Sequence, residues 1–102
     1  MKRVVVTGIG ALTPIGNSVD AYLQALRKGV SGSNPITRFN AAAFKTRFAC
    51  ELKDLDITTV LDKKDVRKLD LFAQYALYTT QEAVAMSGLS EDILATDRTG
   101  VI

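Results

Sequence analysis

The sequence contains no histidine, and its 102 residues include a single cysteine, Cys50. Without histidine, no imidazole is available to activate a thiol nucleophile. One cysteine excludes an internal disulfide framework. The net charge of +2 is too small to indicate nucleic-acid binding. No apolar run approaches membrane-spanning length, and the three valines at 4–6 are too few for a signal peptide. We therefore expect a cytoplasmic protein without nucleic acid, membrane, metal or cofactor bound to this chain.

The composition is that of an ordinary globular chain. Hydrophobic residues make up 47% of the sequence and charged residues 24%, as in most folded domains. A chain of this length supplies one domain with a modest core.

The N-terminal segment predicts a strand followed by a tight turn. Residues 4–6 are all valine, as in a strand buried on both faces of a parallel sheet, and Gly8 and Gly10 follow. A dinucleotide-binding fingerprint requires a further Gly or Ala three residues after Gly10, where a helix meets the pyrophosphate. Thr13 and Pro14 stand there instead. A nucleotide-binding βαβ fragment is therefore a disfavoured alternative.

A first amphipathic helix is predicted to begin at Asn17 or Ser18, since either residue is a suitable N-cap. Apolar side chains recur at helical spacing, at positions 19, 22, 23 and 26. Gly29 is placed to end this helix. A loop is predicted at residues 31–40, and the alternation of residues 48–52 predicts a short strand.

Cys50 lies in this short strand, next to Glu51. A reactive thiol requires a cationic or imidazole neighbour, whereas a carboxylate disfavours the thiolate. We therefore interpret Cys50 as a buried structural thiol. We expect the nearby Phe39, Phe44 and Phe48 to be core contacts beneath a long loop rather than the lining of a ligand pocket.

A long helix is predicted over residues 63–87, with Asp62 as N-cap and Gly88 at its end. Its apolar stripe consists of Val66, Leu69, Phe72, Ala73, Ala76, Leu77, Thr80, Ala83 and Val84. The opposite side of its first two turns carries four cations, Lys63, Lys64, Arg67 and Lys68. Cations oppose the helix dipole there, by about 0.3–1 kcal/mol each. This unfavourable placement suggests a negatively charged partner, but the residues alone favour a simple solvated face.

The alternation of elements predicts an α/β fold with the order β-α-loop-β-α-β. We expect residues 4–7 in the middle of a sheet and the helix over residues 63–87 packed on or near it. Residues 100–102 begin another apolar run, which predicts a further core strand. Because this run stops at Ile102, we expect the chain to be the first part of a larger fold, incomplete by itself.

Eight stretches, found at residues 4–10, 13–17, 27–32, 38–40, 48–49, 53–54, 67–70 and 83–89, match family motifs in order. Together they resemble the N-terminal part of the β-ketoacyl-acyl-carrier-protein synthases, the condensing enzymes of the thiolase superfamily. The resemblance covers the whole chain without a gap. The Thr-Pro-Ile-Gly-Asn turn at residues 13–17 and the stretch from Arg38 to Lys53 resemble type II rather than type I synthases. Cys50 stands where the family usually has glycine.

The resemblance implies a thiolase-like fold, of which residues 1–102 are the N-terminal segment of the N-terminal domain. It implies an acyltransferase that elongates fatty acids by decarboxylative Claisen condensation of malonyl-carrier protein with an acyl group on a cysteine. The catalytic Cys and the two His of the family are expected beyond Ile102. We therefore expect no catalytic residue in this chain, which alone is inactive, and a homodimer for the full-length enzyme.

The resemblance also assigns a partner to the cations of the long helix. In the synthases, basic residues of this helix help to dock the acidic acyl carrier protein, and the matching positions are Lys64, Arg67 and Lys68. The carrier protein supplies the phosphopantetheine arm that holds the acyl and malonyl thioester substrates. The alternative from another class is a non-enzymatic module that binds an acidic partner through the same basic helix.

Overall fold

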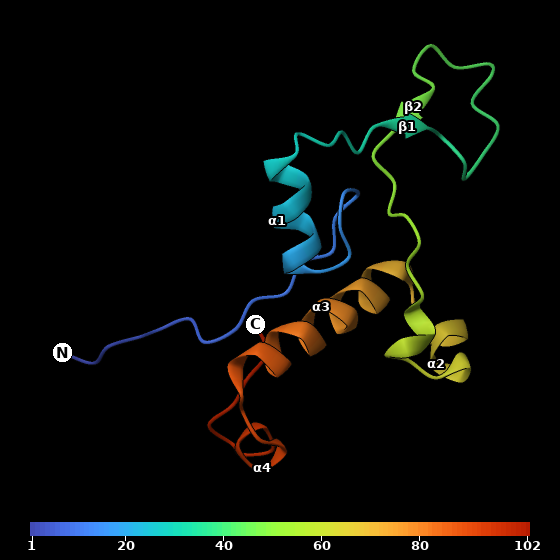
Figure 1. Cartoon of the computed structure of the whole chain (residues 1–102). Coiled ribbons are helices and arrows are strands. Elements are labelled where there is room, and N and C mark those ends of the chain that lie inside the picture. The colour runs from blue at the N-terminus through green and yellow to red at the C-terminus, as the bar shows by residue number, and fades with distance from the viewer.

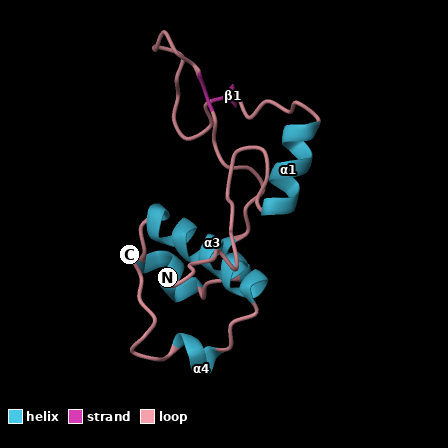
Figure 2. Ribbon diagram, turned by 90° about the vertical axis from the view of Figure 1, so that its left-hand side faces the viewer, coloured by secondary structure: helices cyan, strands magenta, loops and turns pink.

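The computed structural model describes residues 1–102, in which short elements are arranged around one long helix. Their order is α1 (Val19–Arg27), β1 (Asn34–Pro35), β2 (Phe48–Ala49), the 3-10 helix η1 (Ile57–Thr59), α2 (Lys63–Lys68), α3 (Leu71–Ser87) and α4 (Glu91–Leu94). The long helix α3 runs through the middle of the molecule. α1 and the β1–β2 hairpin lie above it in Figure 1 and in Figure 2, and α4 lies below it.

The molecule is open, and the modest core expected from its length is not formed. The Cα radius of gyration is 17.1 Å, whereas a compact domain of this length has about 13 Å. Only Ala25, Ala41 and Gln74 are buried. The hairpin and the N-terminal tail extend in different directions from α3 (Figure 1). The elements therefore contact one another over small areas and do not surround a common hydrophobic core.

The expected central strand at residues 4–7 is not formed. These residues have no regular secondary structure, and Val4 and Val6 are 95% and 81% exposed. The expected strand at residues 100–102 is also absent, and its side chains are exposed. A strand buried in a parallel sheet requires neighbours that pair with its backbone and layers that cover both faces. Nothing within these 102 residues supplies either.

The sheet consists of β1 and β2 alone, paired antiparallel, with Asn34 opposite Ala49 and Pro35 opposite Phe48. β2 confirms part of the short strand predicted over residues 48–52. β1 lies within the segment that the sequence predicted as a loop. A two-residue strand such as Asn-Pro has no alternating pattern by which a sequence identifies it.

Cys50 and the phenylalanines around the hairpin are exposed, which corrects the prediction that they are buried. Cys50 has a free, exposed thiol. Phe39, Phe44 and Phe48 are each more than half exposed. Phe39 and Phe44 contact each other edge to face, with ring centroids 5.7 Å apart. They lie at the hairpin, which projects away from α3, so no apolar layer covers them (Figure 2).

The first helix confirms its predicted beginning and end. Ser18 is the N-cap, and its hydroxyl accepts the backbone N–H of Ala21 at 3.1 Å. Gly29 follows the helix with φ +65°, a left-handed conformation that glycine adopts at little cost. Asn17, the other candidate cap, instead donates from Nδ2 to the carbonyl oxygen of Lys53 at 2.8 Å.

The single helix predicted over residues 63–87 is two helices, α2 and α3. Leu69 leaves helical geometry, with φ −98° and ψ 137°, and Asp70 is the extended N-cap of α3. Gly88 ends α3 as predicted, with φ +68°. The sequence pattern does not predict this break, because the apolar side chains keep helical spacing across residues 69 and 70.

Candidate functional site

α2 presents a group of cations to solvent. We call its members, Lys63, Lys64, Arg67 and Lys68, the basic surface; all four are exposed. A helix turns by about 100° per residue, so these four positions span an arc of about 140° on one side. Val66 lies on the other side and is half-buried. The structure thus brings together Lys64, Arg67 and Lys68, the residues that the sequence predicted as a partner site.

The break at Leu69 changes the electrostatics of this surface. Arg67 and Lys68 lie in the last turn of α2 rather than in the second turn of a long helix. The negative end of a helix dipole favours cations, by about 0.3–1 kcal/mol each near the surface. The prediction that all four cations oppose the helix dipole is therefore wrong for Arg67 and Lys68. Exposed cations grouped on one side still attract an acidic surface over roughly the Debye length, about 10 Å at 0.1 M salt.

Gly8 and Gly10 lie against the backbone of α3. A Cβ on Gly8 overlaps the carbonyl oxygen of Ala83, and one on Gly10 overlaps that of Thr79. Thr79 and Ala83 are one helical turn apart, so the chain runs along α3 here. Residues 7–12 contain no turn, and neither glycine has a positive φ, so the tight turn predicted after the valines is absent. The space that a pyrophosphate requires beside these glycines is filled by α3, which excludes the nucleotide-binding interpretation of this motif.

Glu82 of α3 joins the N-terminal segments to that helix. Its Oε2 accepts the backbone N–H of Ala11 at 2.9 Å, and its Oε1 accepts that of Val19 at 2.8 Å. Val19 is the first residue of α1, so its N–H has no partner inside the helix, and a carboxylate there also favours the dipole. Glu82 was not among the residues predicted from the sequence. Its signal was that Glu82 is the one charged residue of α3.

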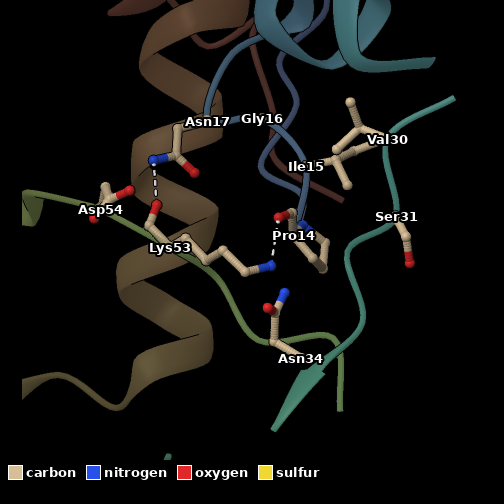
Figure 3. Close-up of a pocket in the computed structure, with 9 residues that line it drawn as sticks. All are labelled: Pro14, Ile15, Gly16, Asn17, Val30, Ser31, Asn34, Lys53 and Asp54. Atoms are coloured by element: carbon tan, nitrogen blue, oxygen red, sulfur yellow. Dashed lines mark hydrogen bonds between the residues drawn. The ribbon is translucent and has the colours of Figure 1, made fainter. Parts of the chain in front are cut away.

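Lys53 forms a second connection between distant segments. Its Nζ donates to the carbonyl oxygens of Pro14 at 3.1 Å and Gly32 at 2.9 Å. Figure 3 shows the side chain reaching across to Pro14, while Asn17 binds the backbone of Lys53 from the other side. Lys53, Pro14 and Asn17 line an open cavity of about 410 Å³. Because two backbone carbonyls accept hydrogen bonds from its ammonium group, we interpret Lys53 as a residue that joins two segments rather than as one that binds a ligand.

The structure brings together no group of side chains suited to hold a metal ion. No three side chains of His, Cys, Asp or Glu gather closely enough to hold a metal ion. None of the helices combines the length and apolar character that crossing a bilayer requires. The prediction that this chain carries no catalytic residue stays a prediction.

The sequence matches one protein family along its whole length. The profile described as "Beta-ketoacyl synthase, N-terminal domain" matches residues 1–102. A 3-oxoacyl-(acyl-carrier-protein) synthase 2 of Synechocystis sp. is 45% identical over 101 residues, 99% of this chain and 24% of that protein. The protein of the same name from Coxiella burnetii is 45% identical over 100 residues, 98% of this chain and 24% of that protein.

A solved structure described as "The ishigamide ketosynthase/chain length factor" matches with a TM-score of 0.78 and 36% identity. The match covers 86% of this chain and 22% of that one. The chain thus spans about a quarter of the length of the curated relatives it matches.

Proposed function

The chain belongs to the β-ketoacyl synthase family, and we propose that it forms the N-terminal part of a 3-oxoacyl-(acyl-carrier-protein) synthase 2. The observation that carries the proposal is the match of two relatives of that name over 98–99% of the chain. The whole enzyme then condenses malonyl-carrier protein with an acyl group held on a cysteine. In that chemistry the thiolate attacks the acyl thioester, and two histidines stabilise the charge that develops on the thioester oxygen.

These catalytic groups are proposed to lie in the remainder of the enzyme, since this chain has no histidine. In the same proposal, residues 4–7 and 100–102 become strands of the thiolase-like sheet when that remainder is present. The exposure of Val4 and Val6 supports the formation of the first strand, because covering apolar side chains with another layer lowers the free energy of the folded enzyme. We also propose that the enzyme is a cytoplasmic homodimer, as the family resemblance implies.

The parent gene tests this assignment directly. We expect its reading frame to continue past codon 102 into a region with a cysteine and two later histidines. A stop codon directly after Ile102 contradicts the assignment and favours a non-enzymatic module that binds an acidic partner.

The basic surface is the proposed docking site for the acyl carrier protein, through Lys64, Arg67 and Lys68. Two observations support it: the cations are exposed on one side of α2, and the relatives' names include the carrier protein. The carrier protein brings its phosphopantetheine arm with the acyl or malonyl group, so this chain binds no cofactor itself. Contacts of this kind steer association more than they add affinity, and salt weakens them.

Charge reversal tests the docking site in the full-length enzyme. With Lys64→Glu, Arg67→Glu and Lys68→Glu combined, we expect weaker carrier-protein binding and a lower kcat/KM for carrier-bound substrates. Turnover of a small thioester analogue stays unchanged, and the salt dependence of association shrinks.

The matched control reverses three exposed cations elsewhere, Lys2, Lys28 and Lys45, which changes the net charge equally. We expect this control to retain most of the carrier affinity. Unchanged carrier affinity in the α2 triple variant rejects the docking site.

A further inference from the structure

Gln74 is the one buried polar residue of the chain, with 6% of its surface exposed. A buried amide is retained at low cost only when its N–H groups find acceptors. The Nε2 of Gln74 donates to the carbonyl oxygen of Val66 at 3.0 Å and to that of Leu69 at 2.8 Å. Val66 lies in α2 and Leu69 directly follows it, whereas Gln74 lies in the first turns of α3. One side chain of α3 thus binds the end of α2 twice.

These two bonds replace the ones that the helix break removes. In a continuous helix, the N–H of residue i+4 donates to the carbonyl of residue i, so Asp70 and Ala73 are the donors expected for Val66 and Leu69. Ala73 instead donates to the carbonyl of Asp70 at 3.1 Å. The amide of Gln74 occupies the acceptors that the main chain leaves open.

α2 has few local features that stabilise it as a helix. It has six residues and its N-cap, Asp62, makes no side-chain cap hydrogen bond. A helix this short is not stable by itself. Apart from the covalent chain and the packing of the half-buried Val66 and Leu69, the hydrogen bonds that join the end of α2 to α3 are those from Gln74.

We propose that Gln74 is the positioning residue of the basic surface, because it sets where Lys64, Arg67 and Lys68 stand relative to α3. The inference rests on the docking function proposed above. Arg67 and Lys68 lie in sequence between the two carbonyls that Gln74 binds. A rotation or fraying of α2 at this point therefore displaces their side chains from the acidic groups of the carrier protein. The amide acts through these cations and does not touch the partner.

A residue that only stabilises the fold behaves differently from a positioning residue. Its loss lowers the melting temperature but leaves carrier binding by the folded enzyme unchanged. A positioning residue changes the carrier affinity, and this effect depends on the cations being present. The test therefore measures the coupling between Gln74 and the basic surface.

The variant is Gln74→Met in the full-length synthase, which keeps the length of the side chain and removes its donors. The matched control is Gln81→Met, two turns further along α3 and exposed. We expect Gln74→Met to weaken carrier-protein binding about five- to tenfold, the size of a typical coupling within one network. We expect the weaker binding to appear as a higher KM for the carrier-bound substrate. The turnover of a small thioester stays within about twofold of the value for the unmodified enzyme. Gln81→Met leaves both unchanged.

The same substitution is then made in a background in which Lys64, Arg67 and Lys68 are all alanine. There we expect Gln74→Met to cause no further loss of carrier affinity, because no cation remains to be positioned. An unchanged affinity in the original background, or an equal loss in both, overturns the proposal.

Two further outcomes are separable. If the triple alanine variant binds the carrier protein like the unmodified enzyme, the docking site itself fails and the role of Gln74 fails with it. If Gln74→Met does not fold, Gln74→Asn is measured instead, since its shorter amide reaches one carbonyl at most. An intermediate, cation-dependent loss of affinity in Gln74→Asn supports the proposal, and full affinity overturns it.

Discussion

At the scale of single residues, three polar side chains hold distant segments of the chain together. In a compact domain, an apolar core has this role. Glu82 accepts two backbone N–H groups, and Lys53 and Gln74 each donate to two backbone carbonyls. Hydrogen bonds to a charged group contribute about 1.5–3 kcal/mol each, and neutral ones about 1 kcal/mol. Because so few side chains are buried, these hydrogen bonds contribute a larger part of the tertiary stability than they do in a compact domain.

The two N-terminal glycines give a prediction at this scale. Gly10→Ala places a methyl group on the backbone of Thr79, which has no flexible end to move aside. We expect a loss of about 1–3 kcal/mol in the unfolding free energy of the full-length enzyme, measured by urea denaturation. Gly8→Ala acts on the same helix, so the double variant loses less than the sum of the two. An unchanged urea midpoint for Gly10→Ala shows that the segment does not lie against α3.

Cys50 carries a second residue-scale prediction, which concerns activity. Because its side chain is exposed, Cys50→Ser is expected to change stability by no more than about 0.5 kcal/mol. Condensation by the full-length enzyme stays within a few-fold of the unmodified rate, since Cys50 is not the proposed nucleophile. Loss of all activity, together with an acyl label found on Cys50 by mass spectrometry, contradicts this interpretation.

At the scale of elements, the helices and the hairpin differ in how far local sequence determines them. α1 begins at a capping serine and ends before a left-handed glycine, and both signals lie within the element. The break between α2 and α3 has no comparable signal. Gln74, five residues after Leu69, stabilises this break because its side chain donates hydrogen bonds to the carbonyls of Val66 and Leu69.

The hairpin yields a prediction of pH dependence. Thr37 follows β1, and its Oγ1 donates to Glu51 Oε2, past β2, at 2.7 Å. The Thr37 hydroxyl holds the pKa of the Glu51 carboxyl below its ordinary value of 4.5, with smaller contributions from the Thr37 and Arg38 backbone N–H groups. A lowered folded-state pKa means that the hydrogen bond stabilises the hairpin fully above pH 4.5. This contribution is lost as the pH falls through the lowered pKa.

Titration of the Glu51 carboxyl carbon by NMR checks this prediction. We expect a pKa below 4.5 and a return toward that value in Thr37→Val. Thr58→Val is the control: the Thr58 hydroxyl lowers the pKa of Asp56, so this substitution raises that pKa and leaves Glu51 unchanged. A Glu51 pKa that does not respond to Thr37→Val shows that the hydrogen bond is not formed in solution.

At the scale of the whole molecule, apolar surface remains uncovered. Val4, Phe72, Val101 and Ile102 are each at least 75% exposed. Phe72 and Leu77 belong to the stripe predicted to pack, yet Leu77 is also 43% exposed. Other members of this stripe, Ala73, Ala83 and Val84, are half-buried, and Gly8 lies against the backbone of Ala83. Extensive exposed apolar surface is rare on monomers and marks surfaces that another chain or segment covers.

This exposure predicts how residues 1–102 behave when they are purified alone. We expect a broad thermal transition rather than a cooperative one, and association at micromolar concentrations, because so few side chains are buried. We expect no decarboxylation of a malonyl thioester, since the chain has no histidine to stabilise charge on the thioester oxygen. Calorimetry, light scattering and a decarboxylation assay measure the three properties. Turnover, or a sharp melt of a monomer, contradicts the proposal that the chain is part of a larger enzyme.

The amino-acid sequence alone determined the family, the bounds of α1 and the grouping of Lys64, Arg67 and Lys68. Each depends on residues that are neighbours in the chain, where capping, helical spacing and motif order are visible. Only the tertiary structure decided that Gly8 and Gly10 contact α3, that Glu82 and Lys53 join distant segments, and that Gln74 spans the helix break. It also decided that Cys50 is exposed and that residues 4–7 are unpaired. Such features depend on what lies opposite a residue in space, and a backbone carbonyl dozens of residues away leaves no periodic pattern in the sequence.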